Sequence, residues 1–187
     1  MTTDVALAAA ALARGEVVAY PTETFYGLGV DALAPAALAR LAALKGRGAD
    51  KALSVLVVGE AMLARLVAEV PPRARALMRA HWPGALTIAL PARPGLPAAL
   101  VSDGCVAVRE SPHPLARALV AAFGGPVTAT SANPAGAPPA RTAATVDFPD
   151  GCLILDGGET PGGLPSTLVR VRGDAVELLR PGAVALP

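Results

Sequence analysis

The chain has 187 residues and a formal net charge of +1, and hydrophobic residues make up 53% of it. This length suits one domain around a large core, and the nearly neutral charge argues against a protein that mainly grips nucleic acid through a basic surface. No apolar run reaches the roughly 18 residues of a membrane span, and the two cysteines are too few for a disulfide framework.

The apolar N-terminus is expected to form a helix over about 4–14, capped by Thr3 or Asp4 and ended by Gly15. It lacks the basic leading region of a signal peptide, so a cytoplasmic location is expected. The later helices are predicted at 35–45, 60–69, 72–80 and 114–123. The strands are predicted at 16–20, 53–58, 85–90, 105–109, 126–130, 152–155, 166–171 and 175–180. This alternation is typical of one α/β domain around a mixed sheet flanked by helices.

The stretch PTETFYGLG at 21–29 follows the first predicted strand. Pro21 ends that strand because it lacks an N–H, and three polar side chains, an aromatic pair and two glycines follow. This composition favours a ligand cradle, with a glycine-rich turn beneath it. Glu23 is expected either to brace a cation of the site or to face solvent.

The stretch KGRGADK at 45–51 places three cations within a short glycine-bearing turn after a helix. Cations at this end of a helix stabilise its dipole. Together with glycines that let a phosphate approach the backbone, they can also form an anion site. Both interpretations stay open at this point.

An apolar strand in VAVRESPHP leads directly to Arg109, whose planar fork suits a carboxylate or a phosphate. His113 in the same stretch and the earlier His81 are expected to be capping or structural residues. Cys105 and Cys152 lie in apolar segments and are expected to be buried free thiols.

The stretch VTATSANPAG leads a strand into Ser131 and Asn133, whose side chains can bind phosphate or ribose oxygens or close a turn. A nucleophilic serine is disfavoured because the chain has no GxSxG elbow. Ser166 opens a later strand, and Arg180 closes the last one. If these segment ends converge, they form a polyanion pocket that is neither a Walker nor a GxGxxG site.

Two loops are expected between these segments. The segment 134–150 is rich in proline and alanine and is expected to be an ordered surface loop. The segment 157–165 is rich in glycine and is a candidate for mobility.

Seven motifs occur in order along the chain: PTETFYGLG, KGR, WPGALT, VAVR, TSAN, PST and LLRPG. With them, the sequence resembles the YrdC-type threonylcarbamoyl-AMP synthase family from about residue 5 to 183. The resemblance implies a single YrdC-like domain over residues 1–187, in the short form without an added C-terminal domain. It also implies a twisted mixed sheet with a concave cationic pocket.

The activity implied by the resemblance joins L-threonine, bicarbonate and ATP into threonylcarbamoyl-AMP and pyrophosphate. Mg²⁺ would arrive with ATP, and no protein-held metal or tightly bound prosthetic group is implied. A separate transferase complex would then modify tRNA, so weak or no direct tRNA binding is expected, and no membrane is involved.

The resemblance also assigns roles to individual residues. Threonine would be bound by Thr22, Arg109 and Ser166. ATP and the reaction centre would be served by Lys45 with Arg47, by Ser131 with Asn133, and by Arg180. The chain departs from the family pattern at Gly48, Ala52, Cys105 and Pro139, which affects the fine contacts to ATP.

Two alternatives accompany this prediction. The first is an RNA-binding module of the same fold, which would show a steep dependence of RNA affinity on salt. The second is a YrdC-like adenylating enzyme with another acceptor.

Overall fold

The computed structural model describes residues 1–46, 52–134, 136–148 and 151–186. In these ranges the strands are β1 (Val18–Pro21), β2 (Tyr26–Gly29), β3 (Ser54–Leu56), β4 (Leu86–Pro91), β5 (Val101–Ser102), β6 (Cys105–Arg109), β7 (Val127–Ser131), β8 (Leu153–Ile154), β9 (Thr167–Arg172) and β10 (Ala175–Arg180). The helices are α1 (Val5–Ala13), α2 (Pro35–Lys45), α3 (Glu60–Leu63), α4 (Pro72–His81) and α5 (Pro114–Phe123), with 3₁₀ turns at Ala98–Leu100 and Ala143–Thr145.

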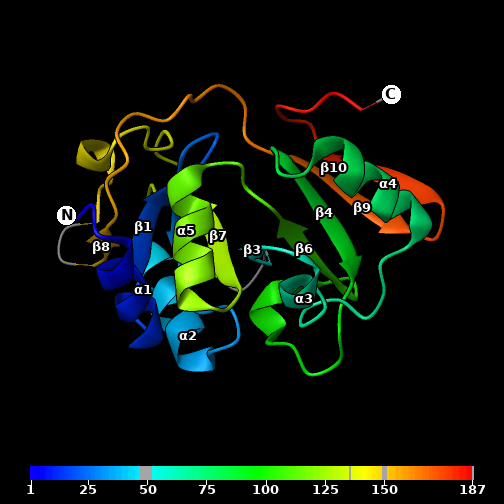
Figure 1. Ribbon diagram of the computed structural model, residues 1–187, viewed down its shortest axis with the longest axis horizontal. Coiled ribbons are helices and arrows are strands. Elements are labelled where there is room, and N and C mark those ends of the chain that lie inside the picture. Colours follow the sequence, from blue (N-terminus) through cyan, green and yellow to red (C-terminus); the bar gives the residue numbers. More distant parts are fainter. Residues whose placement is uncertain (47–51, 135, 149–150, 187) are drawn as a thin grey trace.

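The described strands form one sheet in the order β10-β9-β4-β6-β3-β7-β2-β1-β8, with β5 paired to β6 (Figure 1). Pairs β3/β6, β4/β9 and β1/β8 are parallel, whereas pairs such as β1/β2, β3/β7 and β9/β10 are antiparallel. The predicted mixed sheet is therefore confirmed.

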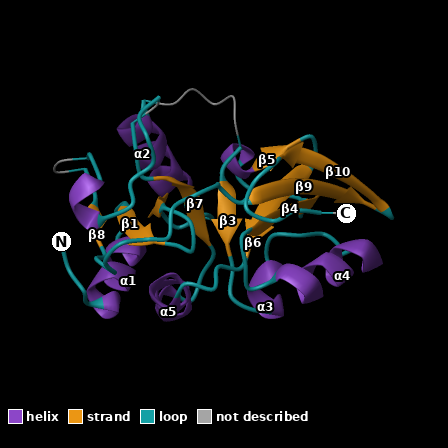
Figure 2. Ribbon diagram, turned by 90° about the horizontal axis from the view of Figure 1, so that it is seen from above, coloured by secondary structure: helices purple, strands orange, loops and turns teal. Residues whose placement is uncertain are grey.

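The burial of strand β1 explains why apolar and polar residues do not alternate in the first apolar run. Val18 and Tyr20 pack into a core cluster with α1 and α5, whereas Val17 and Ala19 pack into a second cluster with α2. Successive side chains of a strand point to opposite faces, so both faces of β1 are buried. Figure 2 shows α2 on one side of this part of the sheet and α1 and α5 on the other.

The helix ends follow ordinary capping chemistry. Oδ1 of Asp4 accepts hydrogen bonds from the N–H groups of Ala6 (2.8 Å) and Leu7 (3.2 Å), so Asp4 and not Thr3 caps α1. Helices α2 and α5 each begin at a proline and end at a glycine in the left-handed conformation, as their sequences predict. Among the described residues, no helix has the length and apolar character needed to cross a bilayer.

The predicted glycine-rich turn after PTET is wrong, because Tyr26–Gly29 is strand β2 and forms a hairpin with β1. The glycines serve packing. A Cβ on Gly29 would lie 2.6 Å from Cε1 of Tyr20 and 2.5 Å from Cγ1 of Val127. The Tyr20 hydroxyl also donates to the carbonyl oxygen of Thr128 at 2.7 Å. Gly29 is thus the residue that lets the Tyr20 ring cross the hairpin.

The helix predicted at 60–69 is also too long, since α3 ends at Leu63. The following chain turns to the sheet: the N–H of Ala68 donates to the carbonyl oxygen of Pro91 at 2.9 Å, and Val67 forms a β-bridge with Ala92. Burial of Leu66 and pairing with the end of β4 replace further helical turns.

A β-bulge interrupts the pairing of β10 with β9. Leu178 is opposite Val169, and Arg180 is opposite Leu168, so Leu179 is an extra residue. Because side chains alternate along a strand, this one extra residue places Arg180 on the opposite face of the hairpin from Leu178.

Candidate functional site

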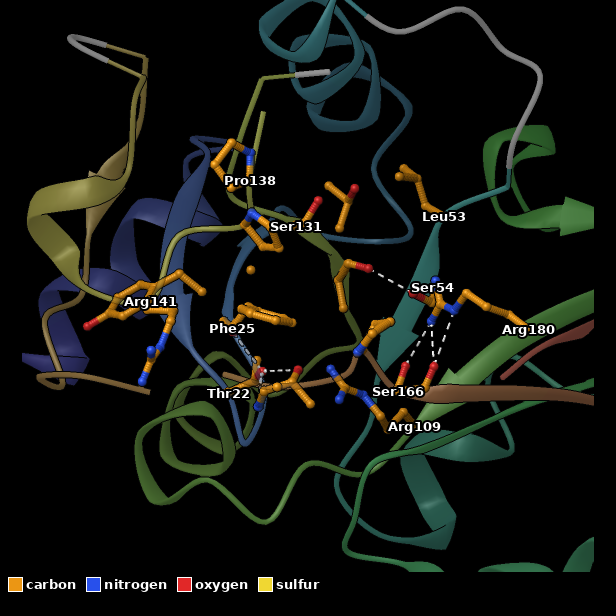
Figure 3. Close-up of a pocket in the computed structure, with 18 of the residues that line it drawn as sticks. Thr22, Phe25, Leu53, Ser54, Arg109, Ser131, Pro138, Arg141, Ser166 and Arg180 are labelled. Carbon is orange, nitrogen blue, oxygen red and sulfur yellow. Dashed lines mark hydrogen bonds between the residues drawn. The ribbon is translucent and has the colours of Figure 1, made fainter. Parts of the chain in front are cut away.

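A cavity of about 720 Å³ lies between the β1–β2 hairpin and the ends of β3, β6, β7 and β10. Five of the predicted site residues line it: Thr22, Arg109, Ser131, Ser166 and Arg180. Figure 3 shows Thr22 and Phe25 on one side of the cavity and Arg109, Ser166 and Arg180 on the other. The predicted convergence of these segment ends is therefore present in the structure.

Thr22 shapes the turn of the hairpin. Its hydroxyl donates to the carbonyl oxygen of Phe25 at 2.7 Å and accepts from the N–H of Thr24 at 3.2 Å. The residue is buried, and its hydroxyl proton is used in the hydrogen bond to Phe25. Thr22 can therefore contact a ligand as an acceptor and not as a donor, in competition with the Thr24 hydroxyl 3.2 Å away.

Arg109, at the end of β6, forms an ion pair with Glu23 of the PTET segment. The exposed fractions of their side chains are only 8% and 13%. The expectation that Glu23 braces a cation is thus confirmed, and the alternative that it faces solvent is wrong.

Arg180 and Ser166 form a second polar group in the cavity wall. Nη2 of Arg180 donates to the carbonyl oxygen of Ser166 at 2.8 Å and to its hydroxyl oxygen at 3.0 Å. The Ser166 hydroxyl also lies 2.9 Å from that of Thr87. Partial burial lowers the pKa of the Arg180 guanidinium, and the positive charge of Arg109 lowers it further. Both effects disfavour the isolated cation, so an anion that binds here gains affinity.

Lys45 and Asn133 are not among the described residues that line the cavity. The ammonium of Lys45 donates to the carbonyl oxygens of Ser131 and Asn133, and it lies 5.7 Å from the centroid of the Phe148 ring. The amide nitrogen of Asn133 donates to the carbonyl oxygen of Ala137 at 2.6 Å, whereas its buried Oδ1 has no hydrogen-bond partner among the described residues. The structure therefore brings Lys45, Ser131 and Asn133 together around the exit of β7. Arg47 and Gly48 lie outside the described residues.

Arg141 also lines the cavity, and the sequence analysis missed it. Its guanidinium pairs with Glu159 at 2.8 Å, and its carbonyl oxygen accepts the N–H of Thr160 at 2.8 Å. Arg141 follows a proline- and alanine-rich stretch and not a predicted strand. A search for cations at strand ends therefore does not find it. Its charge within an otherwise uncharged run is the signal that could have done so.

The glycine-rich loop 157–165 is anchored to the hairpin at both ends. The Tyr26 hydroxyl donates to the carbonyl oxygen of Gly158 at 2.8 Å and accepts the N–H of Gly157 at 3.1 Å. The N–H of Gly162 donates to the carbonyl oxygen of Thr24 at 2.8 Å. The loop thus forms part of the cavity wall in this conformation.

The other sequence expectations have mixed outcomes. Cys105 is a buried free thiol, but Cys152 is only half-buried. Ala52 and Pro139 line the cavity, whereas Cys105 does not. Among the described residues, no cluster of three or more histidine, cysteine, aspartate or glutamate side chains could hold a metal ion.

A mixed sheet flanked by helices, with three arginines and several hydroxyls around one cavity, defines an α/β domain with a cationic pocket. The family model Sua5/YciO/YrdC, described as "Telomere recombination", matches residues 10–182. The chain belongs to this family, which confirms the resemblance found in its motifs.

Relatives extend over most of the chain. It is 41% identical over 185 residues to a threonylcarbamoyl-AMP synthase of Bacillus subtilis, covering 96% of this chain and 54% of the relative. It is 45% identical over 171 residues to a threonylcarbamoyl-AMP synthase of Chromohalobacter salexigens, covering 88% of this chain and 90% of the relative. The chain therefore spans about half the length of the Bacillus relative and most of the Chromohalobacter one.

Solved structures agree with this membership. Sua5 of Pyrococcus abyssi complexed with L-threonine superposes with a TM-score of 0.90 at 37% identity, covering 95% of this chain and 54% of that one. YciO of E. coli superposes with a TM-score of 0.83 at 23% identity, covering 95% of this chain and 88% of that one, and supports the fold alone.

Proposed function

We propose that this protein is a nucleotidyltransferase that forms L-threonylcarbamoyladenylate from L-threonine, bicarbonate and ATP. The observation that carries the proposal is the convergence of Thr22, Arg109, Ser166 and Arg180 on one cavity. Its volume lies within the range of about 300–1,000 Å³ that is usual for small-molecule sites. The proposal is supported by relatives with this name and by a relative crystallised with L-threonine.

Threonine would bind at the hairpin side of the cavity. The Arg109 guanidinium would hold the carboxylate through its planar fork. The acceptor of Thr22 suits the ammonium or hydroxyl group of the amino acid, and the Ser166 hydroxyl would supply a further contact. A threonine seated here replaces water against buried polar groups, which gives directional binding.

ATP would bind between Arg180 and the exit of β7. Arg180 supplies a cation without a carboxylate partner among the described residues. Lys45, Arg47, Ser131 and Asn133 would serve the phosphates and the reaction centre, and Mg²⁺ would enter as part of the Mg–ATP substrate. The buried Oδ1 of Asn133 is an acceptor that a ligand donor or a water can satisfy.

The reaction needs no protein nucleophile. The threonine amine and bicarbonate give a carbamate and water. A carbamate oxygen then attacks the α-phosphorus of ATP in line, the bond to the bridging oxygen breaks, and pyrophosphate leaves. The cavity would contribute by orienting the two substrates and by offsetting their negative charge.

The product would pass to a separate transferase complex that modifies tRNA. The net charge of +1 agrees with weak or no direct binding of tRNA by this chain.

The test is pyrophosphate release by purified protein supplied with Mg–ATP and bicarbonate, with and without L-threonine. Release that requires threonine and is lost with serine or alanine is the expected result. Release that ignores threonine would support an adenylating enzyme with another acceptor. A folded protein without any release would contradict the proposal, and salt-dependent binding of RNA would then favour the RNA-binding alternative.

A further inference from the structure

The Arg109–Glu23 ion pair is the most enclosed among those of the described residues, since both its side chains are less than 15% exposed. Of the two partners, Arg109 lines the cavity, whereas Glu23 is not among its described lining residues. Glu23 therefore contacts the guanidinium without being available to a ligand in the cavity.

Glu23 is itself held by a short chain of hydrogen bonds. One carboxylate oxygen pairs with Arg109, and the other accepts a hydrogen bond from the hydroxyl of Ser111 at 2.5 Å. The Ser111 hydroxyl in turn accepts the N–H of His113, the residue that caps α5, at 3.2 Å. Both carboxylate oxygens are thus fixed, and the orientation of Arg109 is tied to the start of a helix.

Stability alone gives little reason to retain such a pair. Removing two charges from water costs several kcal/mol per ion, and replacing a buried pair by apolar residues is often neutral or stabilising. The pair has a clear electrostatic use at this position, because the charge of Arg109 acts on the nearby Arg180. A carboxylate beside Arg109 offsets that repulsion, so that two guanidinium groups can line one cavity.

We infer that Glu23 is a positioning residue that orients the Arg109 guanidinium toward the carboxylate of the amino-acid substrate, with Ser111 holding Glu23 in place. This role rests on the proposed function, because it assumes that an amino-acid carboxylate binds Arg109. Bidentate recognition depends on the plane of the fork, so a guanidinium that has lost its brace binds the same carboxylate less well.

The variant Glu23→Gln tests this role, since glutamine keeps the shape and an acceptor for Ser111 but removes the charge. We expect the KM for threonine to rise at least about tenfold while the KM for ATP stays within about twofold. The variant Glu23→Asp restores the charge and should recover part of the affinity for threonine.

Glu110→Gln is the matched control. Glu110 is adjacent to Arg109 in sequence, pairs with Arg117 and lines a separate hollow of about 290 Å³. It should leave both KM values unchanged. A threonine KM that is unchanged in folded Glu23→Gln, or raised equally by Glu110→Gln, would overturn the positioning role. So would an equal rise of both KM values.

A second measurement does not depend on activity. The Nε–Hε resonance of Arg109 in the ligand-free protein can be assigned with Arg109→Lys. In the wild type its chemical shift should differ from those of the exposed arginines, and in Glu23→Gln it should move toward them. An unmoved resonance would overturn the role. Suppose instead that the resonance shifts in Glu23→Gln while the wild-type protein neither turns over nor binds threonine. That result would overturn the proposed function, and the amino-acid part of this inference with it.

Discussion

Nη2 of Arg180 donates to both the carbonyl oxygen and the hydroxyl of Ser166, at 2.8 and 3.0 Å. The residue proposed to contact ATP therefore directly supports a residue proposed to contact threonine. The two substrate sites share a wall, so a change at Arg180 should affect both substrates.

We expect Arg180→Lys to lower kcat/KM about 100-fold, because an ammonium cannot reproduce the fork that holds both oxygens of Ser166. Threonine and ATP should both bind less tightly. Steady-state pyrophosphate release with each substrate varied in turn measures this. Arg172→Lys, in the same hairpin, is the control and should behave as wild type; an effect of Arg180→Lys on ATP alone would refute the shared wall.

Lys45→Met should abolish pyrophosphate release and also lower the free energy of unfolding by about 1–3 kcal/mol, since the ammonium donates to two backbone carbonyls at the exit of β7. Urea unfolding and turnover are measured together. Arg40→Met removes another cation of α2 that donates to a carbonyl oxygen, that of Gly15, and should spare turnover. Wild-type turnover in folded Lys45→Met would remove Lys45 from the reaction centre.

Arg109→Ala should raise the KM for threonine far more than the KM for ATP. It should also cost about 3–5 kcal/mol of stability, because Glu23 loses its cation in a buried site. The double variant Arg109→Ala/Glu23→Gln should regain much of that stability without regaining affinity for threonine. Equal changes in both KM values would move Arg109 out of the carboxylate role.

Gly29→Ala should destabilise the protein by about 1–3 kcal/mol, because its Cβ would overlap the Tyr20 ring and Val127. Gly27→Ala in the same strand is the control, since a Cβ there meets its nearest atoms at an ordinary 3.5 Å. Thermal unfolding of both variants decides the matter. Equal melting temperatures would mean that the hairpin relaxes around Gly29.

Burial lowers the pKa of His113, with the charge of Glu23 opposing the shift, and its Nδ1 has no hydrogen-bond partner in the described part of the chain. Above the unfolded pKa of about 6.5 both states are neutral. As the pH falls through that value, the unfolded state binds the proton first, so stability falls. His113→Gln should flatten the fall in melting temperature between pH 7.5 and 5. A wild-type slope in His113→Gln would contradict this account.

The sequence predicted the elements best where local chemistry marks both ends. Helices α2 and α5 match the expected ranges exactly because a proline begins each one and a glycine ends it. Strand β2 was missed because its glycines resemble a turn, and only the position of the Tyr20 ring explains them. The predicted helix at 60–69 is too long because the pairing of Val67 and Ala68 with the end of β4 is a tertiary contact.

The candidate site was predictable in part for the same reason. Arg109 ends an apolar strand and Arg180 ends the last predicted strand, and such strand ends can be found locally. The order of the strands, the bracing of Arg109 by Glu23 and the contribution of Arg141 depend on segments that meet only in the folded chain. The order of the seven motifs makes up for this, because it indicates the family from the sequence alone.

The bulge at Leu179 makes the site depend on backbone geometry as well as on residue type. A regular ladder through the same residues would place Leu179 opposite Leu168 and Arg180 opposite Thr167, which would turn the guanidinium to the other face of the hairpin, away from Ser166. Removal of Leu179 would instead leave Arg180 opposite Leu168 in a ladder without a bulge, on its present face. A search that demands a fixed spacing before the final arginine would therefore reject an active homologue that lacks only the bulged residue.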